Sequence, residues 1–143
     1  MSIDNNLYEK SIKILTDLIA FKTISGQDNS NLIDYCEKIL NNIGIDTFKV
    51  YDDDKKRVNL FGTLKAKNQS TKKPIILSGH TDVVPVSKGW SSDPFVATIK
   101  NDKLYGRGSC DMKGFIACTL AYAPIFKESN LDRDLHFCYT FDE

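Results

Sequence analysis

The sequence predicts an α/β fold, a three-layer sandwich with a mixed, mainly parallel central sheet flanked by helices. Three observations lead to this prediction. Apolar residues recur at spacings of three and four in two N-terminal segments, which is typical of amphipathic helices. The apolar period then changes to two in several short segments, which is typical of strands. A further helical segment, rich in Ala and Ile, precedes one last alternating segment.

Two helices are expected first. Residues 8–21 and 31–43 each gather their Ile and Leu side chains on one side of a helix. The loop between them is polar, and Asn29 or Ser30 is a candidate cap for the second helix. Gly44 stands where a C-terminal glycine cap belongs.

Three strands are expected next. Residues 45–51 alternate and are followed by a charged turn at 52–56, and residues 59–64 form a short strand. The polar turn at 66–73 predicts a hairpin between that strand and the next one. Residues 74–78 hold a continuous apolar run, which favours a central strand covered on both faces.

The second half of the chain begins with a long loop. Residues 95–100 and 103–105 flank an Asn-Asp pair and predict a short hairpin. Residues 112–126 predict a helix, and residues 135–141 alternate strictly as a strand. We find no internal repeat or linker, so the 143 residues are interpreted as one unit.

The composition excludes several classes of protein. Lys and Arg number 19, as do Asp and Glu, so the net charge is zero, unlike that of a dedicated nucleic-acid binder. Hydrophobic residues make up 41% of the chain, which argues against disorder. We see neither a membrane span nor a secretory signal, so we expect a cytoplasmic protein with no membrane partner. The four cysteines match no zinc-finger spacing and are interpreted as reduced thiols.

His80 and Asp82 follow the apolar strand directly. Ligands collect beyond the carboxyl ends of strands in open α/β sheets. A neutral imidazole is a good zinc ligand, and a nearby carboxylate can orient it. Residues two apart in an extended chain point the same way, so His80 could bind a metal while Asp82 holds its second nitrogen. The alternative is a polar strand end with a hydrogen-bonded histidine.

A glycine-rich loop at residues 105–114 leads into the third helix. Asp111 could cap that helix, or it could present a carboxylate rigidly to a metal. Asp142 and Glu143 follow the last strand and could be a solvated edge, or could supply a base and a ligand to the same site. Arg107 and Lys113 are interpreted as structural or solvated rather than anion-binding.

Several blocks in order resemble the dinuclear-zinc amidohydrolase family, which includes deacetylases, desuccinylases, aminoacylases and glutamate-releasing carboxypeptidases. The blocks are GHTDVVP at 79–85, WSSDPF at 90–95, LYGRG at 104–108 and DMKG at 111–114. Segments at 18–25, 32–35, 58–61 and 112–118 resemble most the branch of the family that acts on N-acetylornithine. The resemblance therefore implies hydrolysis of an N-acyl amino acid, in arginine biosynthesis; the alternatives are a desuccinylase or dipeptidase of the same family, or a non-catalytic binding relative.

The resemblance also implies roles for single residues. His80 ligates one of two zinc ions, and Asp82 orients His80 and so takes part in catalysis. Asp111 bridges the two ions, and the peptide bond after this residue is often cis in the family. Glu143 is the general base that takes a proton from metal-activated water. In an alternative register Asp142 is the base and Glu143 a ligand. Cobalt is a possible replacement for zinc, and substrate-binding residues are not assigned.

The family pattern extends beyond residue 143. The resemblance implies that residues 1–143 are the N-terminal part of a metallohydrolase catalytic domain. The next ligand, at position 144, the remaining ligands and a lid or dimerisation domain would lie outside the chain, and the complete protein would be a homodimer. We therefore expect the 143-residue chain alone to bind metal weakly and to be inactive.

Overall fold

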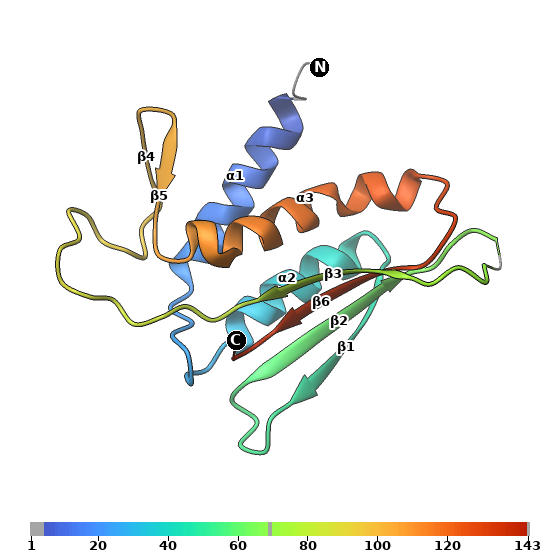
Figure 1. The fold of residues 1–143 in the computed structure, drawn as a ribbon, viewed down its shortest axis with the longest axis horizontal. Coiled ribbons are helices and arrows are strands. Elements are labelled where there is room, and N and C mark those ends of the chain that lie inside the picture. Colours follow the sequence, from blue (N-terminus) through green and yellow to red (C-terminus); the bar gives the residue numbers. More distant parts are fainter. Residues whose placement is uncertain (1–4, 69, 143) are drawn as a thin grey trace.

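The computed structural model describes residues 5–68 and 70–142, which form a mixed α/β fold (Figure 1). The helices are α1 (Asn5–Ala20), α2 (Ser30–Asn42) and α3 (Gly114–Glu128), and a short π-helical turn, η1 (Ser109–Lys113), leads into α3. The strands are β1 (Asp46–Tyr51), β2 (Val58–Leu64), β3 (Ile75–His80), β4 (Thr98–Lys100), β5 (Lys103–Tyr105) and β6 (Leu135–Thr140). The predicted α/β class and the order of helices and strands are confirmed.

The main sheet has the strand order β1-β2-β6-β3. β1 with β2 and β2 with β6 are antiparallel, whereas β3 and β6 are parallel. The sheet is therefore mixed, as predicted, but its described pairings are mainly antiparallel rather than mainly parallel. The predicted hairpin across residues 66–73 is wrong, because β6 pairs with both β2 and β3 and separates them. The hairpin in this region instead joins β1 to β2 through the charged turn. The parallel pairing brings the ends of β3 and β6 together, with His80 opposite Thr140.

The helices lie over one face of the main sheet in the part of the chain that the structure describes (Figure 1). β3 is an edge strand of this sheet, and the central position predicted for it is wrong. Ile75 and Ile76 are 48% and 59% exposed, because no described element covers them. Phe48 and Phe61 stack at 5.1 Å between ring centroids on β1 and β2, and Phe48 is exposed. The apolar run at residues 74–78 therefore predicted the strand correctly, but it did not predict whether other elements cover the two faces of that strand.

The core lies between the helices and the covered face. The amphipathic stripes of the first two helices are buried as predicted, and so are the alternate residues of the last strand; these residues are Ile14, Leu15, Leu18 and Ile19 of α1, Leu32, Ile33, Cys36 and Leu40 of α2, and Leu135, Phe137 and Tyr139 of β6. Burying one such apolar side chain contributes about 1.5–3 kcal/mol. This burial fixes α1 and α3 above the sheet and so fixes the loops that they end in.

The structure confirms some of the caps and turns predicted at the ends of helices and strands. Gly44 has a φ of 69° directly after α2, as a glycine cap requires. Asn101 and Asp102 have φ values of 52° and 57° in the turn between β4 and β5, as a two-residue hairpin of this kind requires. Asn29 occupies the N-cap position of α2 but makes no capping hydrogen bond with its side chain. No helix of the described residues could cross a membrane.

Candidate metal centre

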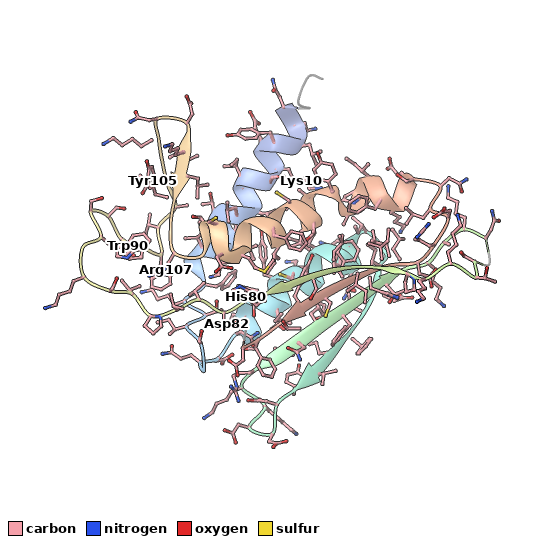
Figure 2. All side chains as sticks on the ribbon, viewed as in Figure 1. Lys10, His80, Asp82, Trp90, Tyr105 and Arg107 are labelled. Carbon is pink, nitrogen blue, oxygen red and sulfur yellow. The ribbon has the colours of Figure 1, made fainter. Side chains whose placement is uncertain are left out.

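An open cavity of about 440 Å³ lies where β3 and β6 end and η1 begins. Its polar lining includes Ser25, His80, Asp82, Arg107, Asp111 and Asp142. His80 ends β3, Asp111 lies in η1, and Asp142 follows β6, so three segments far apart in the sequence meet here. Figure 2 shows His80, Asp82 and Arg107 around this region. The structure thus brings together His80, Asp82 and Asp111, which the sequence singled out, whereas Glu143 lies outside the described residues.

His80 and Asp111 are in direct contact. Nε2 of His80 lies 2.9 Å from Oδ1 of Asp111. The His80 side chain is 10% exposed, whereas that of Asp111 is 77% exposed and faces the open side. Imidazole nitrogen and carboxylate oxygen are both ligands that zinc takes in proteins. The pair therefore presents two suitable donor atoms at one point of the cavity.

The other nitrogen of His80 faces Asp82. Nδ1 lies 3.0 Å from the backbone carbonyl oxygen of Asp82 and 3.5 Å from its carboxylate Oδ1. A carbonyl oxygen only accepts, so Nδ1 carries the hydrogen in this contact. A neutral ring then has its lone pair on Nε2, toward Asp111. The sequence-based expectation that the Asp82 side chain alone holds the second nitrogen is thus modified, since the backbone oxygen is the nearer partner.

The backbone before α3 positions Asp111. Gly108 has a φ of 78°, and a Cβ there would lie 2.6 Å from the side chain of Val83. A Cβ at Gly114 would lie 2.4 Å from the carbonyl oxygen of Ser109. The Asp111–Met112 peptide is cis, as the family resemblance implied. Asp111 has non-helical dihedral angles, and its side chain contacts His80 rather than capping a helix.

Lys113 and Arg107 have structural partners. Nζ of Lys113 donates to the carbonyl oxygens of Leu18 and Phe21, at 2.9 and 2.7 Å, where α1 ends. Burial lowers the pKa of Lys113 to about 8. The Arg107 guanidinium lies 5.2 Å from the ring centroid of Trp90 and donates to the carbonyl oxygen of Pro85. These contacts agree with the structural interpretation of both side chains.

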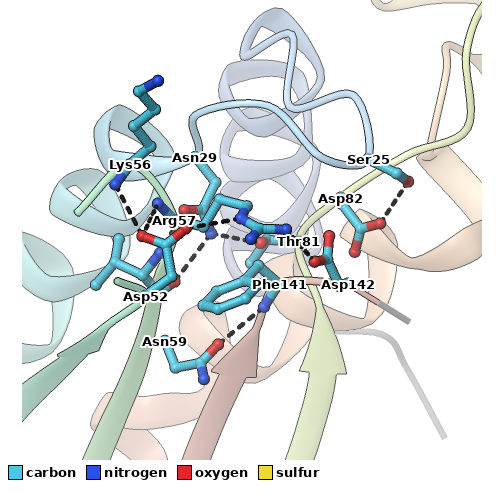
Figure 3. A network of polar contacts seen from close by, with 11 residues as sticks. Ser25, Asn29, Asp52, Lys56, Arg57, Asn59, Thr81, Asp82, Phe141 and Asp142 are labelled. Carbon is cyan, nitrogen blue, oxygen red and sulfur yellow. Dashed lines mark hydrogen bonds and ion pairs between the residues drawn. The ribbon is translucent and has the colours of Figure 1, made fainter. Parts of the chain in front are cut away.

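A polar network holds the end of β6 (Figure 3). Arg57, from the turn between β1 and β2, forms ion pairs with Asp52 and Asp142. Its guanidinium also lies 5.1 Å from the ring centroid of Phe141. The hydrogen bond that Arg57 donates to Asp52 and the negative charges of Asp142 and Asp52 raise the pKa of Arg57, although its partial desolvation acts against this. Asp142 is therefore engaged with Arg57 rather than with His80 or Asp111.

Two residues near the site were missed by sequence reasoning. Ser25 donates a 2.5 Å hydrogen bond to Oδ2 of Asp82, and Asn29 bonds to Thr81, the residue before Asp82. Both lie in the polar loop after α1, for which the sequence predicted a loop and, at Asn29, a possible helix cap but no support of the site. Within the described residues no group of three His, Cys, Asp or Glu side chains is placed to hold a metal. The described part therefore supplies a pair of ligands and their supports.

The chain was compared with known families and proteins. Residues 76–143 match the model of peptidase family M20/M25/M40. A succinyl-diaminopimelate desuccinylase of Rickettsia akari is 37% identical over 140 residues, covering 92% of this chain and 35% of the relative. An acetylornithine deacetylase of Myxococcus xanthus is 40% identical over 109 residues, covering 74% of this chain and 28% of the relative. The chain spans about a third of the length of these curated relatives.

Solved structures have the same fold. Human carnosine dipeptidase 1 superposes with a TM-score of 0.76 at 24% identity, over 96% of this chain and 32% of that one. A protein of Bacillus subtilis, described as a dinuclear metal-binding peptidase of the M20 family, superposes with a TM-score of 0.69 at 16% identity, over 99% and 37%. At these identities the likeness shows the fold.

Proposed function

The chain belongs to peptidase family M20/M25/M40, and from this premise we propose that it supplies part of a metal-dependent site that hydrolyses an N-acyl amide. The observation that carries the proposal is the contact between Nε2 of His80 and Oδ1 of Asp111 at the end of β3. We propose further that residues 1–143 are the N-terminal part of the catalytic domain. Other ligands and a lid or dimerisation domain, which would make the complete protein a homodimer, belong to the rest of that protein.

The residues fit a zinc ion. A neutral imidazole has a single N–H, and both nitrogens of His80 face oxygens that accept, namely the carbonyl oxygen of Asp82 and the carboxylate of Asp111. Imidazole nitrogen and carboxylate oxygen are donor atoms that zinc takes in proteins, so this pair suits such an ion. His80 and Asp111 would hold the ion, and the description of the Bacillus subtilis peptidase supports two ions per complete site. Zinc is proposed, with cobalt as the alternative.

When bound, zinc acts as a Lewis acid and lowers the pKa of a coordinated water to about 7. The protein's own residues prepare the site for this chemistry. Asp82 and the carbonyl at its backbone keep Nε2 of His80 directed at Asp111. Gly108 lets the backbone before Asp111 lie close to Val83, and Gly114 lets the backbone after it lie close to the carbonyl oxygen of Ser109.

We assign the general base to Glu143. Asp142, the base in the alternative register, forms an ion pair with Arg57. The Asp142 carboxylate is thus held by the side chain of Arg57, which comes from the turn between β1 and β2. This pairing supports Glu143 rather than Asp142 in the role, in which it takes a proton from water and returns it to the leaving amine.

Two substrates are candidates. The sequence segments at 18–25 and 112–118 favour N-acetylornithine, which accords with the Myxococcus xanthus deacetylase. The Rickettsia akari relative, which covers more of the chain, favours N-succinyl-diaminopimelate. Both are linear amides of small amino acids, so the proposed chemistry is the same for the two.

The test uses the complete protein encoded by the reading frame that contains these residues. It is assayed with zinc or cobalt on N-acetylornithine, N-succinyl-diaminopimelate and dipeptides. We expect one of them to be hydrolysed, and expect His80→Ala and Asp111→Asn each to reduce kcat by at least about a hundredfold.

The matched controls are His136→Gln, a histidine of β6 that contacts Thr63 outside the cavity, and Asp102→Asn in the turn between β4 and β5. Both should retain kcat within about twofold. Turnover that survives His80→Ala and Asp111→Asn, or no turnover of any of these amides with either metal, contradicts the proposal.

A further inference from the structure

The Asp82 carboxylate has an uneven environment. Asp82 is 6% exposed, and its Oδ2 accepts the 2.5 Å hydrogen bond from Oγ of Ser25. Its Oδ1 is buried without a hydrogen-bond partner among the described residues and lies 3.5 Å from Nδ1 of His80. Burying a carboxylate oxygen without a partner is unfavourable, so its orientation toward His80 needs a cause.

The Ser25 hydroxyl is held rigidly. The backbone N–H of Ser25 donates to the carbonyl oxygen of Val83 at 3.0 Å, and that of Val83 donates to the carbonyl oxygen of Thr23 at 2.8 Å. Oγ1 of Thr23 donates to the carbonyl oxygen of Thr81 at 2.6 Å. The loop after α1 is thus paired with the segment on both sides of Asp82. Figure 3 shows Ser25 directed at Asp82.

A serine suits this position because its hydroxyl is neutral. An Arg or Lys on Oδ2 would neutralise the carboxylate and compete with His80 for it. A hydroxyl group satisfies one oxygen and leaves the negative charge in place. The other oxygen then remains available to the imidazole, which makes Nε2 a better ligand.

We propose that Ser25 is a positioning residue that orients the Asp82 carboxylate toward His80 and thereby strengthens His80 as a metal ligand. This inference rests on the proposed function, in that His80 is taken as the ligand. It adds a residue 55 positions before His80 in the sequence, brought to the site only by the pairing of the loop after α1 with residues 81–83.

The experiment uses the complete protein encoded by the reading frame that contains these residues, and three variants of it, Ser25→Ala, Ser25→Thr and Ser87→Ala. Ser25→Thr retains a hydroxyl, and Ser87→Ala removes an exposed hydroxyl from the loop after β3. Two signals of His80 are measured by NMR. The first is the ring ¹H–¹⁵N pattern without metal, which reports which nitrogen carries the hydrogen. The second is the change of this pattern on titration with ZnCl₂, and the His80→Gln variant assigns the signals.

We expect Ser25→Ala to change the metal-free ring pattern and to raise the Kd for zinc about tenfold. Ser25→Thr should restore the metal-free ring pattern and bring the Kd for zinc to within about threefold of the original value. Ser87→Ala should change neither the ring pattern nor the Kd. Urea unfolding of each variant shows whether the chain is folded. If both Ser25→Ala and Ser25→Thr lower the urea midpoint of unfolding, and Ser25→Thr restores neither the ring pattern nor the Kd, the effect is a general loss of structure. That outcome counts against a positioning role.

The results separate the two proposals. If zinc binds through His80 and Ser25→Ala leaves both the ring pattern and the Kd unchanged, the Ser25 proposal is overturned and the metal site stands. If zinc does not perturb His80 but Ser25→Ala changes its ring pattern and Ser25→Thr restores it, the positioning by Ser25 stands and the metal site fails.

Discussion

At the scale of single residues, Lys113 shows how a charged side chain can serve the fold. It is fully buried, and it donates to the carbonyl oxygens of Leu18 and Phe21 at the end of α1, each of which also accepts one backbone hydrogen bond. A cation at a helix C-terminus is also favoured by the helix dipole. Lys113 therefore connects the metal-centre loop to α1, in the segment that continues to Ser25.

Replacing Lys113 by Met tests this connection. The substitution keeps much of the side-chain volume but removes the two buried hydrogen bonds from Nζ to the carbonyl oxygens of Leu18 and Phe21. We expect the free energy of unfolding at pH 7 to fall by about 2 kcal/mol, measured by urea denaturation. Lys10→Met, on the exposed side of α1, should change it by less than about 0.5 kcal/mol. Equal effects of the two substitutions would contradict a connecting role for Lys113.

At the scale of elements, buried polar side chains align the helices with the sheet. Asn29 is 2% exposed and joins three segments. Its Nδ2 donates to the carbonyl oxygen of Val58 and to Oγ1 of Thr81, both at 2.9 Å, and its Oδ1 accepts from the N–H of Val58 at 2.8 Å. The start of α2 is thereby attached to β2 and to the segment after β3. As a helix cap, the Asn29 side chain would have accepted a hydrogen bond from a backbone N–H of α2 alone.

We expect Asn29→Ala to lower the free energy of unfolding by about 2–3 kcal/mol, because the N–H and C=O of Val58 lose their partner inside the protein. Asn42→Ala, at the exposed end of α2, provides the control, with a change below about 0.5 kcal/mol. Chemical denaturation followed by far-UV circular dichroism measures both. A loss below 1 kcal/mol for Asn29→Ala would mean that water replaces these hydrogen bonds.

The attachment of β1 to α2 should depend on pH. Nζ of Lys49 lies 2.7 Å from Asp34 and 2.6 Å from Glu37. Burial acts to lower the pKa of Lys49, but the hydrogen bonds to Asp34 and Glu37 outweigh it and raise the pKa from 10.5 to about 12. Because the folded pKa is the higher one, the stabilisation is fully present below pH 10.5 and is lost as the pH rises through 12.

The measurement compares the chain with its Lys49→Met variant. We expect a difference in the free energy of unfolding of about 0.5–1 kcal/mol at pH 8, which shrinks between pH 10.5 and 12. The difference for Lys65→Met, an exposed lysine at the end of β2, should stay near zero throughout. A Lys49 difference that stays constant, or grows, with rising pH would show that the ion pairs do not carry it.

At the scale of the whole molecule, stability is distributed unevenly. One continuous core joins α1, α2 and α3 to β2 and β6. β4 and β5 pair only with each other among the described strands, and Ile99 and Tyr105 are exposed. Elements with few buried contacts open at low free energy. The hairpin of β4 and β5 therefore contributes little to the stability of the unit that holds the metal centre.

Native-state hydrogen exchange followed by NMR tests this division. We expect the paired amides of β4 and β5 to exchange at least about a thousandfold faster than that of Phe137 in β6, because the core must open to expose the latter. The amides of β2 and β6 should share one opening free energy, equal to that of global unfolding. Equal protection of the hairpin and β6 would show that the hairpin unfolds only with the core.

The sequence alone determined those features that depend on residues close together along the chain, namely helices, strands and turns. The helical stripes of α1 and α2, the alternation of β6 and the Asn-Asp turn were readable because helix and strand periods bury one face. His80, Asp82 and Asp111 could be proposed as a site because the ends of strands and a glycine-rich loop predict where ligands gather. Their motifs also carried the family resemblance.

Only the tertiary structure decided what depends on contacts between distant segments. The insertion of β6 between β2 and β3, the edge position of β3 and the pairing of the loop after α1 with residues 81–83 arise from long-range pairing. The alternation of apolar residues along a strand shows that it is a strand. It does not show which strands it pairs with or which elements pack on its faces. For the same reason Ser25, Asn29 and Arg57 look like ordinary loop residues in the sequence, and only the fold shows that they contact Asp82, Thr81 and Asp142 around the candidate metal centre.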